Sequence, residues 1–305
     1  MSAYPGRRSR IRLSARWNPK NPVVCYSVES ITIGQQVGPY RIESVLGTGG
    51  AGVVYLASDP RLRRHVAIKT VDRSRFDTRA GYSLLHEARI AASLNHPSIC
   101  RVHEVGDVDG EPFIVMELVD GVSLASVIPR DRGLSYEVTL NYAIQIVDAV
   151  AHAHRQGIVH GDLKSRNIMI GPNGSVKMLD FGLAVCCANL CNSTHDDTTR
   201  SDDTRQARGT VPYMAPELLC GQRADARSDI WALGVILFEM ASGRRPFAGV
   251  TSYEIAWAIL AGQRAQLPGN LPLPFRRLIN KCLAFKPNAR YPSAAALASA
   301  LDDVP

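Results

Sequence analysis

The hydrophobic pattern of the chain changes character near residue 120. Before this point, short apolar segments bounded by Gly, Pro, Asp or Arg predict β-strands, because a strand needs only about four to eight such residues. The predicted strands cover 41–46, 53–57, 65–69 and 113–116. Between them, segment 83–94 has its apolar residues at helical spacing and predicts a helix.

Helical patterns dominate the rest of the chain. Segment 134–154 predicts a long amphipathic helix, 229–240 is almost wholly apolar and predicts a buried helix, and 294–301 predicts an Ala-rich terminal helix. Apolar runs at 168–170 and 176–179 flank a Gly-Pro-Asn-Gly sequence, which predicts a short hairpin. Strands are therefore expected mainly in the first part of the chain and helices in the second.

The length and the charge distribution limit the possible classes of protein. A chain of 305 residues can bury a sizeable core, as one large or two modest domains. The net charge of +7 would suggest a nucleic-acid partner, but six basic and no acidic residues lie in the first 20, which leaves about +1 elsewhere. We expect residues 1–36 to be a flexible basic extension, with order beginning near Tyr40, and expect no nucleic-acid partner. A membrane surface or an anionic partner is the alternative for this tail.

Membrane and cysteine signals are weak. No stretch reaches the roughly 18 apolar residues of a membrane span, and the N-terminus lacks the apolar region of a secretory signal. Seven cysteines without framework spacing favour a reducing compartment, so we expect a cytoplasmic location. Cys186, Cys187 and Cys191 form a cluster, but no partner pair stands nearby at zinc spacing, so we expect no metal or redox role.

Four kinds of polar side chain meet at the predicted hairpin. Asp162, Lys164 and Asn167 precede its first strand, and Asp180 follows its second. Phosphoryl transfer needs a carboxylate to orient the attacking hydroxyl, a cation for the moving phosphate, and oxygen ligands for Mg²⁺. The motif His160-Gly-Asp-Leu-Lys-x-x-Asn, followed 13 residues after its Asn by Asp-Phe-Gly, is specific. It resembles the catalytic core of a eukaryotic-type protein kinase.

A glycine-rich segment and a lysine add to this resemblance. Gly47-Thr-Gly-Gly-Ala-Gly52 alone fits a plain hairpin equally well, and a dinucleotide-binding fold would require a helix after the glycines. Here the segment continues as a predicted strand, which is the kinase pattern of a flap over the triphosphate. Lys69 follows Gly52 by 17 residues, as the phosphate-binding lysine of that family does.

The resemblance implies an α+β, two-lobed kinase domain over residues 37–305, with a small lobe of about 37–119 and a large, mainly helical lobe of about 120–305. The sequences Leu46-Gly-Thr-Gly-Gly-Ala-Gly-Val-Val-Tyr55 and Val211-Pro-Tyr-Met-Ala-Pro-Glu217 are most similar to the bacterial Ser/Thr kinases. The resemblance implies ATP-dependent phosphorylation of Ser and Thr in protein substrates, in signalling, with autophosphorylation.

The family's roles can be carried to matching residues. Asp162 would position the substrate hydroxyl and Lys164 would stabilise charge on the γ-phosphoryl group. Asn167 and Asp180 would hold Mg²⁺, for which Mn²⁺ could substitute. The remaining catalytic assignments are Lys69 on the phosphates, Glu87 paired with Lys69, and Thr210 bonded to Asp162 and Lys164. The resemblance places ATP against Leu46, Gly47, Thr48, Gly49, Gly50, Ala51, Gly52, Val54, Ala67, Lys69, Met116 as the gatekeeper, backbone groups of Glu117 and Val119, and Met169.

Some positions bear on control and specificity. Gly161 stands where many relatives carry an arginine that binds a phosphorylated loop, so that form of control is in doubt. Arg166 is expected at the rim of the substrate groove, or simply in solvent. Arg290 is expected to form a structural pair with Glu217. His152 and His154 are expected to be surface or packing residues.

Two other classes of protein remain open. A pseudokinase would share the fold without turnover, but it usually lacks the strand lysine or one of the two aspartates, and Lys69, Asp162 and Asp180 are all present. A small-molecule kinase would keep the ATP residues, but it usually lacks the 209–217 segment and the Glu217–Arg290 pair. Labelled ATP and a generic protein substrate would separate the three classes.

Overall fold

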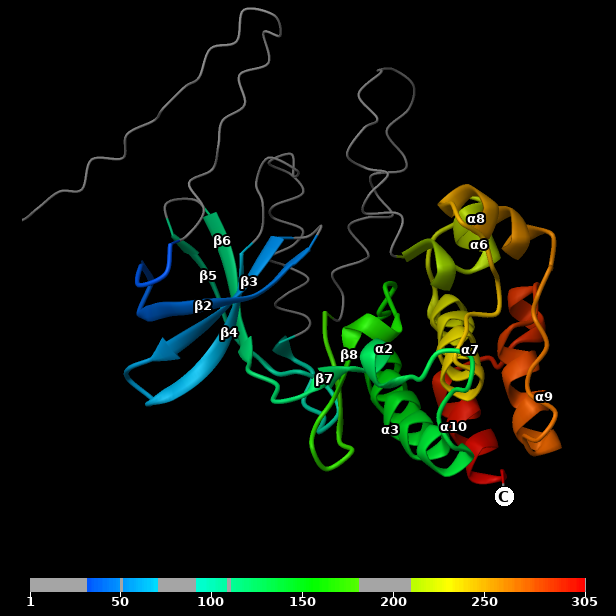
Figure 1. The fold of residues 1–305 in the computed structure, drawn as a ribbon. Coiled ribbons are helices and arrows are strands. Elements are labelled where there is room, and N and C mark those ends of the chain that lie inside the picture. The colour runs from blue at the N-terminus through cyan, green and yellow to red at the C-terminus, as the bar shows by residue number, and fades with distance from the viewer. Residues whose placement is uncertain (1–31, 50–51, 71–91, 109–110, 181–209, 305) are drawn as a thin grey trace, which may run out of the picture.

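Among the described residues of the small lobe, six antiparallel strands form one sheet in the order β1-β2-β3-β4-β6-β5 (Figure 1). The computed structural model describes residues 32–49, 52–70, 92–108, 111–180 and 210–304. The strands are β1 (Gln36–Val37), β2 (Tyr40–Gly49), β3 (Gly52–Asp59), β4 (Arg64–Thr70), β5 (Val102–Val108) and β6 (Glu111–Glu117).

The alternation of side chains gives this sheet two different faces. One face is a closed apolar core that includes Tyr55, Ile68 and Val115, all at most 3% exposed. The register pairs Val54 with Lys69 and Ala67 with Met116. Because directly opposed residues share a face and neighbours along a strand alternate, these four side chains lie together on the other face.

The predicted strands are present and longer than predicted, but the small lobe also has features that the hydrophobic pattern did not indicate. The hydrogen-bonded structure begins before Tyr40, because Gly34 N–H donates to Ile42 O and Ile42 N–H donates to Gln35 O. The sequence analysis did not predict strand β5. None of its residues is fully buried, so its sequence contains no apolar run that would indicate a strand. The predicted helix 83–94 lies outside the described residues apart from its last three positions.

The large lobe begins with a small sheet of order β7-β8-β9 and continues as helices (Figure 1). The predicted hairpin is formed by β8 and β9, with β7 paired to β8. The elements are β7 (Val122–Ser123), α2 (Leu124–Val127), α3 (Tyr136–Arg155), η2 (Ser165–Asn167), β8 (Ile168–Ile170), β9 (Val176–Met178), η3 (Val211–Tyr213), α6 (Pro216–Leu219), α7 (Ala226–Ser242), α8 (Ser252–Leu260), α9 (Leu273–Cys282), η4 (Pro287–Ala289) and α10 (Ala294–Asp302).

Helix α7 is the central element of the large lobe, as its apolar sequence predicted. It packs against α3, α9 and α10, and its Trp231 and Phe238 are almost fully buried. A capping box on Asp225 begins the helix, and Gly243, in the left-handed conformation with φ 73°, ends it. Within the described ranges, no helix has both the length and the apolar composition that a membrane span requires.

The predicted pair between Glu217 and Arg290 is confirmed. Arg290 Nη1 and Nη2 each donate to a different carboxylate oxygen of Glu217 at 2.7 Å, and the arginine side chain is fully buried. The same guanidinium donates to the carbonyl oxygens of Ala284, Phe285 and Arg227. This buried pair fixes the segment after Thr210 against the base of the large lobe.

Candidate active site

Three side chains gather around the carboxylate of Asp162. Lys164 Nζ donates to Asp162 Oδ2 at 2.6 Å, and Asn167 Nδ2 donates to the same oxygen at 3.2 Å. Thr210 Oγ1 donates to Asp162 Oδ1 at 3.0 Å and lies 3.3 Å from Lys164 Nζ. Thr210 comes from a segment 48 residues away. The bonds expected from Thr210 to the aspartate and the lysine are therefore present.

The backbone before Asp162 is held by one buried carboxylate. Asp229, at the start of α7 and 1% exposed, accepts the N–H of His160 at 2.8 Å and of Gly161 at 2.9 Å. Asp162 N–H donates to His160 Nδ1, so His160 Nε2 carries the proton and donates to Leu179 O at 3.1 Å. Gly161 has φ 74°, a left-handed conformation that glycine adopts without strain. The loop is thus tied both to α7 and to the residue preceding Asp180.

Two further contacts below this loop were not predicted. His154 was expected to be a surface or packing residue. Its side chain is 8% exposed, which fits packing, and its Nε2 lies 2.8 Å from Asp229 Oδ2, a contact that the sequence did not indicate. Tyr213 donates to Glu239 at 2.7 Å and lies 2.9 Å from Ser165 Oγ. Burial, followed by the charge of Glu239, raises the pKa of Tyr213, so its hydroxyl stays protonated and supports the loop.

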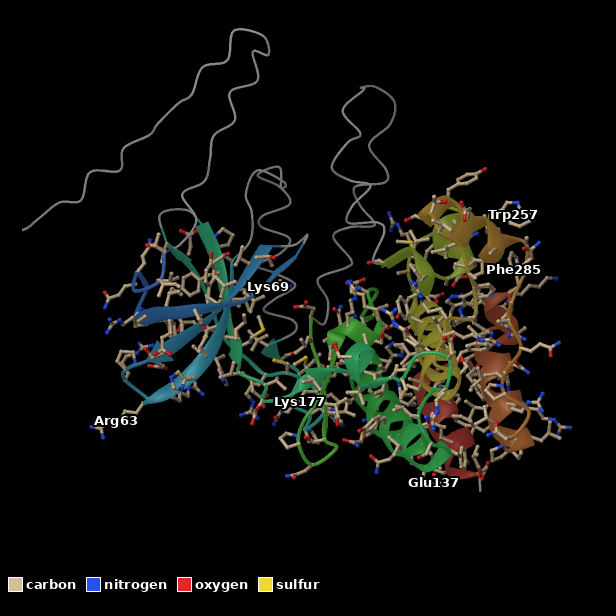
Figure 2. All side chains as sticks on the ribbon, viewed as in Figure 1. Arg63, Lys69, Glu137, Lys177, Trp257 and Phe285 are labelled. Carbon is tan, nitrogen blue, oxygen red and sulfur yellow. The ribbon has the colours of Figure 1, made fainter. Side chains whose placement is uncertain are left out.

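The second cluster joins the two lobes. Lys69 Nζ, from β4 of the small lobe, lies 2.8 Å from Asp180 Oδ1, just after β9 of the large lobe. The lysine side chain is 8% exposed, and Figure 2 shows Lys69 on the sheet at the side of the large lobe. Asp180 has φ 58°, a left-handed conformation that is uncommon outside glycine and typical of functional sites. Glu87, the expected partner of Lys69, lies outside the described residues.

The oxygen atoms of Asn167 and Asp180 fit a divalent cation. Both amide hydrogens of Asn167 are directed to Asp162, toward its backbone O at 3.0 Å and Oδ2 at 3.2 Å, so the amide oxygen points elsewhere. Leu179 N–H donates to Asn167 O at 2.8 Å, which places Asp180 beside Asn167. Among the described residues no group of three His, Cys, Asp or Glu could hold a metal. Two protein oxygens completed by phosphate and water suit Mg²⁺.

The residues assigned to the nucleotide come from the sheet face that carries Lys69, from the β2–β3 hairpin, from the link and from β8. Gly47, Thr48, Gly49 and Gly52 form the end of the β2–β3 hairpin, where Gly49 pairs with Gly52. Leu46 sits at a bulge in β2 and is about half exposed. Val54, Ala67 and Met116 share the face of Lys69, while Met169 lies in β8 and Val119 in the link between the lobes. Gly50 and Ala51 lie outside the described residues.

The backbone of Glu117 is only partly available to a ligand. Its N–H donates to Arg101 O at 2.8 Å, and its carbonyl oxygen lies 3.5 Å from Cys100 Sγ, a weak donor. Burial, with the charges of Glu117 and Asp180, raises the pKa of Cys100 to about 12, so the thiol stays protonated. The carbonyl is therefore the only backbone group of Glu117 left for the edge of an adenine.

The two-lobed architecture and the two clusters are those of the protein kinase class. In comparison with known families, residues 40–301 match the protein kinase domain, and the chain belongs to this family. It is 38% identical over 271 residues to serine/threonine-protein kinase PknA of Mycobacterium tuberculosis, covering 87% of this chain and 61% of that protein. It is 38% identical over 273 residues to PrkC of Bacillus subtilis (86% and 40%) and 34% identical over 268 residues to PknB of Mycobacterium leprae (84% and 41%). The chain thus spans between 40% and 61% of the length of these relatives.

Proposed function

We propose that this chain is an active serine/threonine protein kinase domain that transfers the γ-phosphate of ATP to protein hydroxyls in signalling. The observation that carries the proposal is the cluster of Lys164, Thr210 and Asn167 around Asp162, beside the Lys69–Asp180 pair. The names of the relatives support Ser/Thr specificity. The need for ATP and the seven cysteines without framework spacing favour a cytoplasmic location.

The geometry suggests how Asp162 meets a substrate. A carboxylate has about four acceptor positions. Oδ2 receives Lys164 and Asn167, whereas Oδ1 receives Thr210 alone and keeps one position for the acceptor hydroxyl. Asp162 would orient that hydroxyl and take its proton as the new O–P bond forms, while the bond between the γ-phosphorus and the bridging oxygen breaks and ADP leaves. Lys164, already within reach of both Asp162 and Thr210, would stabilise charge on the transferring phosphoryl group.

The phosphates would be held by both lobes. We assign Lys69 to the α- and β-phosphates, with Asp180 and Asn167 as the Mg²⁺ ligands; Mn²⁺ satisfies the same oxygen donors. A bound cation would neutralise part of the negative charge of the phosphates. The hairpin glycines, which leave room for close approach of backbone N–H groups, would cover the phosphates, and Leu46, Val54, Ala67, Met116 and Met169 would enclose the adenine.

The test is incubation of the chain with labelled ATP, Mg²⁺ and a generic protein substrate, followed by phosphoamino-acid analysis. We expect label on Ser and Thr of the substrate and on the kinase itself, because the 181–209 segment carries six hydroxyl residues between Ser193 and Thr204. Retention of ATP binding without any labelled protein would favour a pseudokinase. Label confined to small molecules would favour a small-molecule kinase.

Arg166 should influence which substrates are used. Its side chain is exposed between the proposed base Asp162 and the proposed metal ligand Asn167, in the loop that faces the substrate. A guanidinium at this rim would repel a basic side chain close to the acceptor hydroxyl. We expect peptides with Arg two residues before the acceptor to be poor substrates. Arg166→Glu should raise their kcat/KM by at least about fivefold.

A peptide array with both proteins measures this preference, and Arg277→Glu on the exposed face of α9 is the matched control. If the wild type preferred Arg at that peptide position, Arg166 would not repel basic substrates. If both substitutions had the same effect, the position of Arg166 would not matter for substrate choice.

A further inference from the structure

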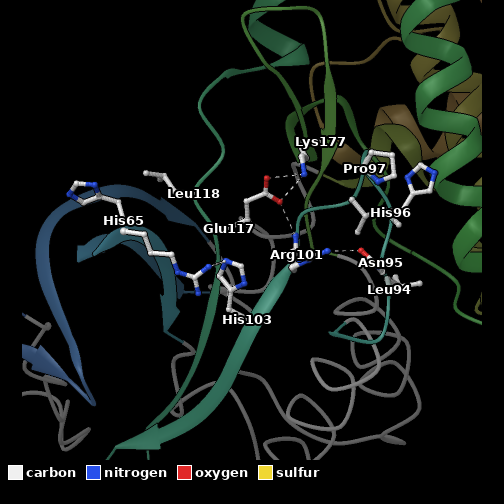
Figure 3. Close-up of a pocket in the computed structure, with 12 residues that line it drawn as sticks. His65, Leu94, Asn95, His96, Pro97, Arg101, His103, Glu117, Leu118 and Lys177 are labelled. Atoms are coloured by element: carbon white, nitrogen blue, oxygen red, sulfur yellow. Dashed lines mark hydrogen bonds and ion pairs between the residues drawn. The ribbon is translucent and has the colours of Figure 1, made fainter. Parts of the chain in front are cut away.

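A cavity of about 460 Å³ lies behind the link between the lobes (Figure 3). Its walls come from the start of β4, the segment that leads into β5, the link at Glu117 and Leu118, and Lys177 of β9. Among the described residues that line it there is no member of the Asp162 cluster and neither partner of the Lys69–Asp180 pair. The cavity therefore lies outside the two phosphotransfer clusters and shares Glu117 with the residues assigned to the nucleotide, and its volume is typical of small-molecule sites.

The cavity has an excess of positive charge. Three permanent cations, Arg64, Arg101 and Lys177, line it together with a single carboxylate, that of Glu117. Figure 3 shows Glu117 at the centre, bonded to Lys177, whose Nζ lies 2.8 Å from the carboxylate. The lysine and the glutamate neutralise each other, so the two arginines determine the charge of the cavity.

The guanidinium of Arg101 has a neutral partner. Its Nη2 donates to the amide oxygen of Asn95 at 2.6 Å. No carboxylate in the described part of the chain lies within 4 Å of this guanidinium. The backbone N–H of Arg101 donates to Glu117 Oε2 at 3.2 Å, which fixes the residue at the cavity wall while leaving its charge uncompensated.

Arg64 has one carboxylate partner, at the limit of an ion pair. Its Nη1 lies 3.2 Å from His103 Nε2, and the closest carboxylate, Asp59, is 3.9 Å from Arg64 Nε. Burial, then the charge of Arg64, lowers the pKa of His103, so the neutral ring accepts the hydrogen bond. Arg64 and His103 together thus carry one positive charge rather than two. Arg64 and Arg101 both retain donors for an anion, because a guanidinium has five N–H groups.

The cavity is also lined by the apolar residues Leu94, Ile99, Leu118 and Pro97, of which Leu94 and Ile99 are each 3% exposed. A bare inorganic ion would leave these side chains uncovered. A ligand that combines a compact carbon body with several negative groups would contact both the charged and the apolar residues.

We propose that this cavity binds a small organic polyanion, carrying at least two phosphate or carboxylate groups, that joins Arg64 and Arg101 of the small lobe to Lys177 of the large lobe. The anionic groups meet the two guanidinium groups and the carbon body lies against Leu94 and Ile99. Because Glu117 belongs to the link and Lys177 to β9, such a ligand would contact both lobes without touching the phosphotransfer residues.

The test is calorimetric titration of the whole chain with two probes, citrate and inositol 1,4,5-trisphosphate, in low salt without Mg²⁺. We expect at least one probe to bind with a dissociation constant below about 100 µM. Arg101→Gln should weaken binding at least about tenfold, since a charge-assisted contact is lost. Raising the salt concentration should weaken binding as well.

Two control variants locate the probe. Arg63→Gln changes an arginine at the far edge of the small lobe (Figure 2) and should bind as the wild type does. Lys69→Met alters the proposed ATP site and should also leave probe binding unchanged. Absence of heat for both probes up to about 5 mM would overturn the proposal. Equal losses of probe affinity in Arg101→Gln and Arg63→Gln would also overturn it. Loss of probe binding in Lys69→Met would overturn it too, because the probe would then occupy the ATP site.

Discussion

Lys69→Met should lower the rate of phosphoryl transfer at least about a hundredfold and leave the fold intact. Methionine has a similar length and keeps the apolar contacts of a side chain that is 8% exposed, but it removes the ammonium group. It therefore removes the charge that would position the phosphates, and it leaves Asp180 without its bond across the lobes. Initial rates with labelled ATP and a peptide substrate, together with a melting curve, measure both effects.

Lys286→Met is the matched control for this substitution, because Lys286 is exposed in the large lobe. Its rate should equal that of the wild type. If Lys69→Met kept more than about a tenth of the wild-type rate, the role assigned to Lys69 would be wrong.

Arg290→Leu should lower the free energy of unfolding by about 3–5 kcal/mol, a large share of the stability of a domain. The substitution leaves the buried Glu217 carboxylate without its bidentate partner and removes the hydrogen bonds that Arg290 donates to three backbone carbonyls. For a chain of this size we expect the melting temperature to fall by roughly 6–15 °C. Denaturant unfolding measures the free-energy change.

The exposed Arg277, changed to Leu on α9, should cost no more than about 0.5 kcal/mol and serves as the control. The double variant Glu217→Leu with Arg290→Leu should recover part of the loss, because it removes the unpaired buried charge. Equal stabilities of the Arg290→Leu and Arg277→Leu variants would mean that the buried pair does not hold the segment after Thr210.

Sequence reasoning succeeded where the signal is local. The strands around the glycines have short apolar patterns, and Asp162, Lys164 and Asn167 lie within six residues, so their chemistry is visible together. The buried helix was predicted because its apolar run is shorter than a membrane span requires and is interrupted by Glu239. The contacts of Thr210 and Arg290 with distant residues were predicted only through the family resemblance.

The features that were missed depend on tertiary contacts. Strand β5 lacks an apolar run because it lies at the edge of its sheet, where side chains are only half buried. The contact of His154 with Asp229 spans 75 residues, and no spacing rule links them. Tyr213 meets Glu239 only because η3 lies against α7. The cavity behind the link likewise collects charges from four separate segments, none of which forms a motif by itself.

The rate of labelled phosphate transfer by Asp180→Asn tests the central claim most directly. The exchange keeps the size of the side chain and a hydrogen bond to Lys69, but removes the negative charge proposed to hold Mg²⁺. The control is Asp303→Asn, an exposed residue after α10. We predict that Asp180→Asn melts within a few degrees of the wild type but transfers phosphate at least about a hundredfold more slowly at saturating Mg²⁺, whereas Asp303→Asn matches the wild type. A rate for Asp180→Asn within about tenfold of the wild type would contradict the assignment of this cluster as a phosphotransfer site.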